Sequence, residues 1–386
     1  MQVSADDIRR ALRAGELMFY YQPKVSFLTG EVTGAEALIR WRRGVDDVVL
    51  PQDFIPLAEA EGLISDITQA MFPRLVTDIQ RIRGEMPHAA VAFNVSAHDL
   101  ESPRLGALVR DAVLSGAVDK ELLELEITES AVVSCDAHSN RSLVSLVGEG
   151  IHLSMDDYGT GFSSLDTLNR LPFSAIKIDQ GFVLKMIRSP KSTTLVKASV
   201  ATAQMLGIKT VVEGIESETV YHFLMHSGCS EAQGFWISVP LPLEAFIDFL
   251  RAGRRWPSSP VGMLRMAQLS HTWQHKLLMD QVFAYLRSSE PHQLSLENLH
   301  IHHRHCTLGQ WCCGAGQIFA GDHDFDTLQN PHRRMHGICE DIFTALHGKA
   351  PSGVLETLLR ELNEAACTVS NCLQRLETRL LIGELG

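Results

Sequence analysis

The chain contains 386 residues, of which 45% are hydrophobic and 21% are charged, and its formal net charge is −12. This acidic balance argues against a nucleic-acid backbone as the main partner. No run of about 18 apolar residues predicts a transmembrane helix, and the charged N-terminal segment does not resemble a signal peptide. The eight cysteines form no small secreted framework. These features predict a cytoplasmic protein with free thiols.

Eight short apolar segments with strand character occur in the first 240 residues. They are 17–25, 32–41, 89–95, 122–127, 152–155, 175–178, 210–212 and 232–236. Helical periodicity is found at 51–61, 64–83, 104–115, 141–149 and 193–206. Because a strand, helix, strand repeat favours parallel pairing, we expect an α/β fold in which eight strands close a (β/α)₈, TIM-type barrel. An open doubly wound sheet is the alternative on pattern alone.

About 250 residues suffice for such a barrel, so the remaining length predicts a second domain of roughly 120 residues. Segment 253–262 has the proline, serine and charge of a linker. Beyond it, helical patterns run over 263–287, 324–347 and 354–381, with a shorter one over 296–306. Four helices with short connections predict an all-α four-helix bundle over 263–386. Of the 17 histidines, 11 lie between His271 and His347, so a histidine metal site is expected here.

Each predicted strand of the first domain carries a polar residue at or near its end. These residues are Gln22, Glu36, Asn94, Glu126, Asp156, Asp157, Lys177, Glu213 and Gln233. In a (β/α)₈ barrel they would meet on one face, and carboxylate and amide oxygens suit Mg²⁺ or Mn²⁺. The adjacent Asp156 and Asp157 can hold two cations, as two-metal phosphodiester hydrolysis requires. Lys177 adds a positive donor close to the attacking water or phosphoryl oxygen.

The tripeptide Glu36-Ala37-Leu38, within GAEALIRW, resembles the signature of the EAL phosphodiesterases, which hydrolyse the bacterial second messenger cyclic di-GMP to linear pGpG. The resemblance covers about residues 5–250 and follows the family's motif order. The motifs are YQPKV, FIPLAEAEGLI, FNVS, LEITES, MDDYGTGFSSL, IKID, VVEGIE and AQGFW. It implies that residues 1–252 form an EAL phosphodiesterase domain.

The resemblance also implies roles for individual residues. The first metal would be held by Glu36, Asn94, Glu126 and Asp156, and the second by Asp156 and Asp157. Lys177 would orient the hydrolytic water, Glu213 would act with the second metal as base or water ligand, and Gln233 and Glu216 would support this network. Substrate contacts would come from Gln22, Leu38 and Arg40. Glu129 would steady the loop after Asp157, which takes part in dimer contacts. The chain departs from the family at Tyr158, where Phe is usual, and at Lys24, where an apolar residue is common.

In the second domain, His332 and His336 lie four residues apart on one helix face. Arg333 follows His332, so the glutamate base of a metalloprotease helix is missing and hydrolysis is not expected there. Together with Cys306 and one further imidazole, the pair could form a closed tetrahedral zinc site. The segments HHRHCTLGQW and FDTLQNPHRRMH resemble the CZB domain, a zinc-binding four-helix bundle. The resemblance implies Cys306, His332 and His336 as ligands, with a histidine of the first helix as the fourth. His275 is preferred over His271, because the apolar residues after it recur at the spacing of a bundle helix.

The sequence therefore predicts a cyclic di-GMP phosphodiesterase with two Mg²⁺ or Mn²⁺ ions in the barrel and one Zn²⁺ in the helical domain. Zinc binding or oxidation of the Cys306 thiolate is expected to regulate it, and a homodimer is expected. The alternative is a receptor that binds cyclic di-GMP without cleaving it, with a structural zinc domain that serves dimerisation.

Overall fold

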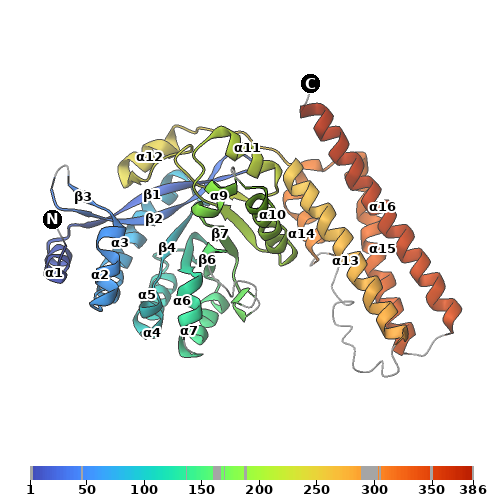
Figure 1. Ribbon diagram of the computed structural model, residues 1–386, viewed down its shortest axis with the longest axis horizontal. Helices are drawn as coiled ribbons and strands as arrows, with labels where there is room; N and C mark the ends of the chain where they lie inside the picture. Colours follow the sequence, from blue (N-terminus) through green and yellow to red (C-terminus); the bar gives the residue numbers. More distant parts are fainter. Residues whose placement is uncertain are drawn as a thin grey trace. The chain divides into compact units, whose positions relative to one another are not determined.

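The computed structural model describes residues 3–44, 47–135, 137–159, 167–168, 170–186, 189–287, 303, 306–347 and 351–384 (Figure 1). The chain forms two compact units, of which the second consists of Val200–Gly207, His226–Gly228 and Ser259–Gly386, so the last passage from the first unit to the second lies between Ser258 and Ser259. This point lies inside the predicted linker. Part of that linker packs on the first unit, because the Trp256 backbone N–H donates to the Gly30 carbonyl at 2.9 Å and the Tyr221 hydroxyl donates to the Pro257 carbonyl at 2.8 Å.

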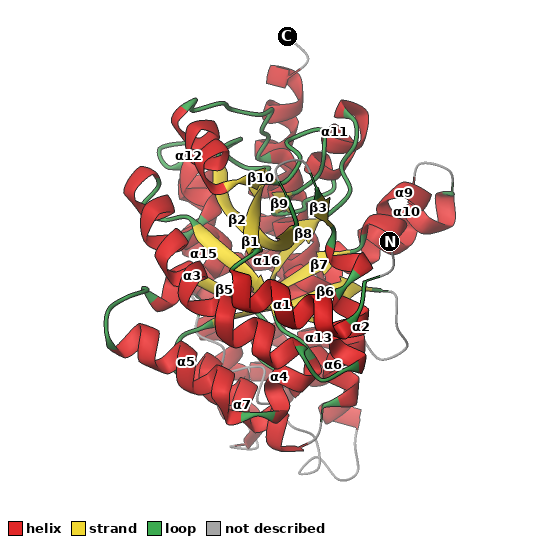
Figure 2. Ribbon diagram, turned by 90° about the vertical axis from the view of Figure 1, so that its left-hand side faces the viewer, coloured by secondary structure: helices red, strands yellow, loops and turns green. Residues whose placement is uncertain are grey.

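Eight strands of the first unit close a barrel. In sheet order they are β1 (Leu17–Ser26), β9 (Glu231–Ala232), β8 (Lys209–Val212), β7 (Ala175–Ile178), β6 (His152–Tyr158), β5 (Leu123–Thr128), β4 (Ala90–Asn94) and β2 (Val32–Arg42), and β2 pairs back to β1. Two short strands, β3 (Val48–Val49) and β10 (Leu241–Pro242), pair with β2 and β1. Figure 2 shows the strands enclosed by helices. The predicted closed barrel is confirmed, and the open sheet is wrong.

The expectation of parallel pairing throughout is wrong for β1, which is antiparallel to both β2 and β9. The connection from β1 to β2 spans only the turn after Ser26, and Gly30 there has a φ of 70°. A parallel connection needs a crossover of a dozen or more residues, whereas a short turn joins antiparallel strands. The predicted strand at 232–236 is also shorter, since β9 ends at Ala232. A Cβ on Gly234 would lie 2.3 Å from the Ile215 backbone, so the chain turns closely against that residue.

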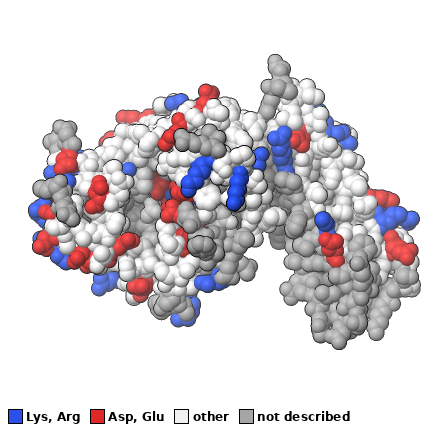
Figure 3. All heavy atoms as spheres, viewed as in Figure 1, with Lys and Arg blue, Asp and Glu red and all other residues white. Residues whose placement is uncertain are grey.

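Helices cover the outside of the barrel in chain order. They are α1 (Ala5–Ala14), α2 (Ile55–Ala60), α3 (Ile64–Glu85), α4 (Ala97–Glu101), α5 (Pro103–Leu114), α6 (Glu129–Ser134), α7 (Ala137–Gly148), α9 (Gln180–Met186), α10 (Pro190–Met205), α11 (Glu218–His226) and α12 (Leu243–Arg251), with 3₁₀ turns at Pro51–Asp53 and Lys120–Leu122. In α3 the buried Ile67, Met71, Leu75 and Ile79 recur every four residues, the spacing that places apolar side chains on one helix face. On the face viewed in Figure 3, acidic and basic side chains are interspersed over this unit.

The second unit is helical where the structure describes it. It contains α13 (Val261–Arg287), α14 (Thr307–Cys313), a 3₁₀ turn at Ala315–Phe319, α15 (His323–His347) and α16 (Ser352–Glu384). Its core includes Leu264, Phe325, Ile342, Leu362 and Val369. The predicted helix at 296–306 lies almost wholly outside the described residues, so the four-helix bundle stays a prediction. Among the helices in the described ranges, none has the length and apolar character needed to span a bilayer.

Candidate active site

Every strand of the barrel brings one polar side chain to a single cluster. The residues are Gln22 on β1, Glu36 on β2, Asn94 on β4, Glu126 on β5, Asp156 on β6, Lys177 on β7, Glu213 directly after β8 and Gln233 directly after β9. The predicted strand-end residues thus meet because the barrel closes. One carboxylate oxygen from each of Glu36, Glu126 and Asp156 lies within 4.8 Å of the others.

Lys177 is fully enclosed at the centre of this cluster. Its Nζ lies 2.7 Å from Glu213, 2.9 Å from Glu126, 3.2 Å from Glu36 and 3.4 Å from Asp156. Burial alone would lower the pKa of Lys177, but the four carboxylates raise its pKa well above the ordinary value of 10.5. Lys177 is therefore held as a cation by the four carboxylates and can donate hydrogen bonds.

The surrounding carboxyl groups differ in how easily they ionise. Burial opposes ionisation of Glu36, but Lys177 and hydrogen bonds from Gln233 and Asn94 lower its pKa to about 2. Burial instead raises the pKa of Glu126 to about 8 and that of Glu213 to about 7. The charge of Lys177, and of Lys24 at Glu126, opposes these increases in pKa, whereas neighbouring carboxylates add to them. The same residue type thus has opposite behaviour at positions a few ångströms apart.

Two amide side chains fix the orientation of Glu36. Asn94 Nδ2 donates to Glu36 Oε1 at 2.8 Å, and Gln233 Nε2 donates to Glu36 Oε2 at 2.7 Å. Gln233 Nε2 also lies 3.0 Å from Gln22 Oε1, and Gln22 donates to the Ser238 carbonyl at 3.2 Å. Within the described residues, the buried side-chain oxygen Oε1 of Gln233 has no hydrogen-bond partner. This oxygen can accept a hydrogen bond from a bound molecule or from water.

Asp156 and Asp157 follow each other on β6, where neighbouring side chains normally point to opposite faces. The register with β7 shifts between Met155 and Tyr158, and Asp157 has a φ of 55°, the one positive value among the described residues other than glycine. Its backbone N–H donates to Asp156 Oδ1 at 2.8 Å. Burial, then the charges of Asp156 and Asp179, raise the pKa of Asp157. The bulge therefore keeps both carboxylates in the same charged region.

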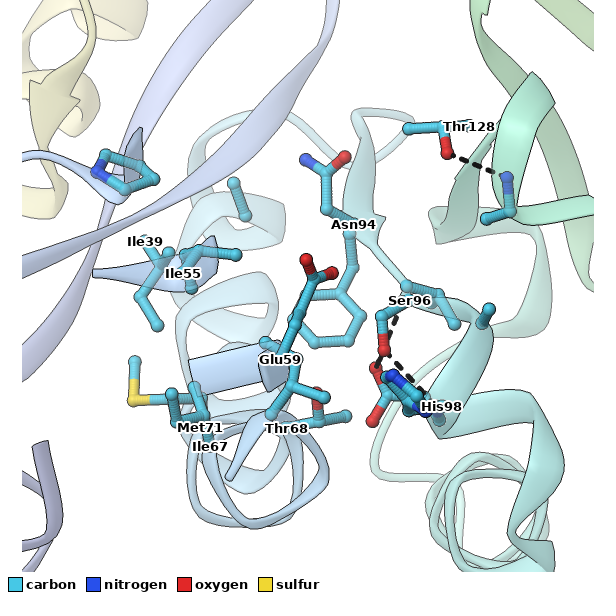
Figure 4. A pocket seen from close by; sticks show the side chains of 18 of the residues that line it. Ile39, Ile55, Glu59, Ile67, Thr68, Met71, Asn94, Ser96, His98 and Thr128 are labelled. Carbon is cyan, nitrogen blue, oxygen red and sulfur yellow. Dashed lines mark hydrogen bonds between the residues drawn. The ribbon is translucent and has the colours of Figure 1, made fainter. Parts of the chain in front are cut away.

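Two cavities open beside the cluster. The larger, about 760 Å³, is lined by Glu36, Leu38 and Asn94 together with α2, α3, α4 and α6. In Figure 4, Ile39, Ile55, Ile67 and Met71 lie on one side of it, and Asn94, Ser96 and His98 lie on the other. The smaller, about 230 Å³, is lined by Gln22, Glu36, Leu38, Asp156, Gln180, Glu213, Gly214, Glu216, Gln233, Gly234 and Phe235. A ligand with apolar or aromatic parts and a charged centre would match this pair of cavities.

The remaining predicted residues occupy different surroundings. Glu216 accepts a hydrogen bond from Gln180 at 3.3 Å. The buried Glu129 accepts one from the Gly159 backbone N–H at 3.4 Å, directly after β6. Arg40 lines neither cavity: its guanidinium lies 5.7 Å from the centre of the Tyr20 ring and donates to the Ile39 carbonyl at 2.9 Å.

Two residues near the cluster, Lys24 and Phe235, have positions that the sequence does not indicate. Lys24 is buried, and its Nζ lies 3.2 Å from Glu124 and 2.9 Å from Glu126. Glu124 and Glu126 lie two residues apart on one strand and so share a face, but nothing in the sequence pairs them with Lys24. Phe235 lines the smaller cavity although 63% of it is exposed.

A second candidate site lies in the helical unit. Cys306 Sγ is 3.1 Å from His332 Nε2, the ring centres of His332 and His336 are 5.1 Å apart, and the three residues offer ligand atoms within 4.8 Å of one another. The ring of His303, which the sequence did not single out, lies 6.4 Å from that of His332. Burial lowers the pKa of His332 to about 3, which keeps the ring neutral, the form that binds metals.

The two candidates for a fourth ligand differ in their contacts. His271 is 4% exposed, and its Nε2 lies 3.3 Å from the Ala366 carbonyl oxygen. His275 is half-buried, and its Nε2 has no hydrogen-bond partner among the described residues. Neither belongs to the close group formed by Cys306, His332 and His336.

Known proteins similar to this chain share its first unit. The cyclic di-GMP phosphodiesterase RocR of Pseudomonas aeruginosa is 37% identical over 246 residues, which are 64% of this chain and 63% of RocR. The cyclic di-GMP phosphodiesterase PdeR of Escherichia coli is 36% identical over 242 residues, 62% of this chain and 36% of PdeR. The chain spans about a third of the length of most curated relatives that it matches.

A solved structure described as the PaMucR phosphodiesterase in complex with c-di-GMP matches with a TM-score of 0.59 and 36% identity. It covers 62% of this chain and 98% of that one. The family model for the EAL domain matches residues 5–240, which include every residue of the barrel cluster. The chain belongs to the EAL domain family.

Proposed function

We propose that this chain is a phosphodiesterase that hydrolyses cyclic di-GMP to linear pGpG. The observation that carries the proposal is the cluster in which Lys177 is surrounded by Glu36, Glu126, Asp156 and Glu213. Relatives whose names state this activity at 36–37% identity support the choice of substrate. In the reaction, water attacks one phosphorus of the cyclic dinucleotide. The bond to one ribose oxygen breaks, and that oxygen takes a proton.

The donor set of the barrel fits two Mg²⁺ or Mn²⁺ ions. Six carboxyl groups, those of Glu36, Glu124, Glu126, Asp156, Asp157 and Glu213, share the barrel interior and mouth with two lysines, Lys24 and Lys177. When all are ionised, four negative charges remain, and two divalent cations would neutralise them. All the donors are oxygen atoms, which these cations prefer.

Glu36, Asn94, Glu126 and Asp156 would hold the first ion, and Asp156 with Asp157 the second. When bound, such ions lower the pKa of a coordinated water and neutralise charge on the phosphoryl group. The ion positions are a proposal based on the donor chemistry and on the family resemblance.

The chain's own residues perform the remaining tasks. Lys177 orients the attacking water or a phosphoryl oxygen through its ammonium hydrogens. Glu213, 2.7 Å from Lys177, would accept the proton of that water or help to hold it. Gln233 keeps Glu36 oriented, and its side-chain oxygen Oε1 can accept a further hydrogen bond. Glu216 supports this side of the site through its hydrogen bond from Gln180.

The two cavities would hold the substrate on either side of its phosphates. Gln22 and Leu38 line the smaller one, and the apolar wall of the larger one suits a guanine base. Arg40 is proposed to bind a phosphate, which requires its guanidinium to leave the Tyr20 ring. Glu129 would steady the loop after Asp157 and its contacts in a homodimer.

We propose further that the helical unit is a zinc-binding CZB-type domain that regulates the barrel. Cys306, His332 and His336 would be ligands, with His275 as the fourth. A zinc–thiolate bond fixes two helices to the segment before α14, so loss of zinc or oxidation of the Cys306 thiolate would change helix packing. The buried His332, whose pKa burial lowers to about 3, supports binding of a metal there.

Incubation of the purified chain with cyclic di-GMP and Mn²⁺ tests the barrel proposal. We expect pGpG from the wild-type chain and none from Glu36→Ala or Asp156→Ala. Binding of cyclic di-GMP without any pGpG, at every zinc concentration, would establish the non-catalytic receptor instead. Activity retained in either variant would refute the two-metal assignment.

Zinc content by mass spectrometry tests the helical site. We expect one zinc ion per chain, lost in Cys306→Ala and in His332→Ala. His275→Ala and His271→Ala then separate the two candidates for the fourth ligand. If turnover is the same with and without zinc while zinc is bound, the site is structural and the regulatory proposal is wrong.

A further inference from the structure

Lys24 on β1 is a buried lysine to which the proposed mechanism gives no task. Its side chain is 3% exposed, and its Nζ lies 2.9 Å from Glu126 Oε1 and 3.2 Å from Glu124 Oε2. Removing an ammonium group from water is expensive unless it is paired with anions. One of these partners, Glu126, is a proposed ligand of the first ion, so Lys24 contacts a metal ligand rather than the ion itself.

Glu126 is held at both of its oxygens. Lys24 contacts Oε1, and Lys177 contacts Oε2 at 2.9 Å. The two lysines come from β1 and β7, strands on different sides of the barrel. A carboxylate bonded in this way cannot rotate about its last torsion without losing one charge-assisted hydrogen bond.

The two lysines have different anchors. Lys177 is bonded entirely within the cluster, to Glu36, Glu126, Asp156 and Glu213. Lys24 has its second partner outside the cluster, since Glu124 lines a separate cavity of about 390 Å³ together with Lys24 itself. A cation that enters the cluster competes with Lys177 for the same oxygens, whereas it leaves the bond between Lys24 and Glu124 intact.

We propose that Lys24 is a positioning residue of the metal centre. Anchored by Glu124, it retains Oε1 of Glu126 and so directs Oε2 at the first cation. This inference rests on the proposed metal-dependent function. Residues that orient a metal ligand typically change metal affinity or activity about 10- to 100-fold when they are replaced.

The test is calorimetric titration of Mn²⁺ into the zinc-loaded full chain, with Glu36→Gln as the blank for ions bound elsewhere. Lys24→Met removes the ammonium group and keeps an unbranched apolar stem. Lys209→Met is the matched control: Lys209 lines the same cavity, but it is 69% exposed and lies 3.8 Å from Glu231. Lys24→Gln keeps a neutral donor, and it replaces the Met variant if that chain does not fold.

We expect Lys24→Met to raise the Kd for Mn²⁺ by about 10-fold or more and Lys209→Met to leave it unchanged. Lys24→Gln should raise it by less, because one hydrogen bond to Glu126 can persist. The Mn²⁺ concentration that half-saturates hydrolysis should rise by the same factor, while kcat at saturating Mn²⁺ should largely recover. A purely structural counter-charge would lower the melting temperature without this selective loss of metal affinity.

An unchanged or lower Kd in both Lys24 variants would overturn the proposal. Failure of the proposed function gives a different result: a wild-type chain that binds Mn²⁺ but forms no pGpG refutes hydrolysis and leaves the Kd comparison valid. A wild-type chain that binds no Mn²⁺ above the Glu36→Gln blank overturns both.

Discussion

Glu36 and Glu213 should affect the stability of the metal-free barrel in opposite directions. Both contact Lys177, yet the pKa of Glu36 is lowered from 4.5 to about 2 and that of Glu213 is raised from 4.5 to about 7. Glutamine has the size of a neutral glutamic acid, so a Glu→Gln substitution replaces the ionised side chain by a neutral one of similar shape. Each difference of about 2.5 in pKa corresponds to about 3 kcal/mol between the charged and neutral forms.

The sign follows from proton linkage. Glu36 has a depressed pKa, so its ionised form stabilises the fold above pH 4.5, and this stability is lost only as the pH falls toward 2. Glu213 has a raised pKa, so its penalty is absent at low pH and complete above about 7. At pH 8, Glu36→Gln should therefore destabilise the metal-free chain by up to about 3 kcal/mol, and Glu213→Gln should stabilise it by up to about the same amount.

Thermal unfolding in excess chelator, at pH 8 and pH 5, measures both effects against the wild-type chain. For a barrel of this size, about 3 kcal/mol corresponds to roughly 6–12 °C in Tm. At pH 5 the gain from Glu213→Gln should shrink to about 1 kcal/mol or less, while the loss from Glu36→Gln should persist. Shifts of the same sign at pH 8, or a Glu213→Gln effect independent of pH, would refute the reasoning. Both variants should be inactive, because Glu36 is a proposed metal ligand and Glu213 is the proposed base or water ligand.

Three further predictions concern single positions. Gly34→Ala should destabilise the barrel by about 1–3 kcal/mol in urea unfolding, because a Cβ there would lie 2.2 Å from the Ala90 carbonyl oxygen; a stable variant would mean that β2 and β4 can separate at this point. Asp157→Gly should be more stable than Asp157→Ala by about 1 kcal/mol, the reverse of the usual order, because φ is 55°; the usual order in the same assay would exclude strain there. Phe235→Ala should change stability by less than about 0.5 kcal/mol, since 63% of the residue is exposed. It should raise the KM for cyclic di-GMP about 5- to 150-fold if the ring stacks on a base, and an unchanged KM would exclude that contact.

Most of the barrel could be predicted because its signals are local. Strands such as 122–127 and 175–178 are short apolar runs, and each ends near one polar residue of the site. The direction of β1 was the exception. Its connection to β2 is a short turn that contains Gly30, and the rule for parallel crossovers does not hold for a connection of this length. The length of a connection decides between the two pairings more reliably than the general alternation of strands and helices.

The side chains whose roles were missed depend on contacts between distant segments. Lys24 and Glu124 are 100 residues apart, and nothing near Lys24 in the sequence shows that its ammonium group is buried. The substrate contact of Arg40 stays a prediction, and the sequence does not show that its guanidinium lies over the Tyr20 ring. Such positions are set by packing and by competing partners, which local patterns do not contain.

The contrast between Glu36 and Glu213 shows what the fold adds to the sequence. Both were recognised as acidic residues at strand ends, which is all that their spacing indicates. In the structure, Glu36 accepts hydrogen bonds from Asn94 and Gln233, and it also lies within ion-pair distance of Lys177. Glu213 contacts Lys177 but also experiences the charges of Asp156 and Glu36. A divalent cation would offset that repulsion, so the cluster should gain most from metal binding at the carboxylates that are least stable without it.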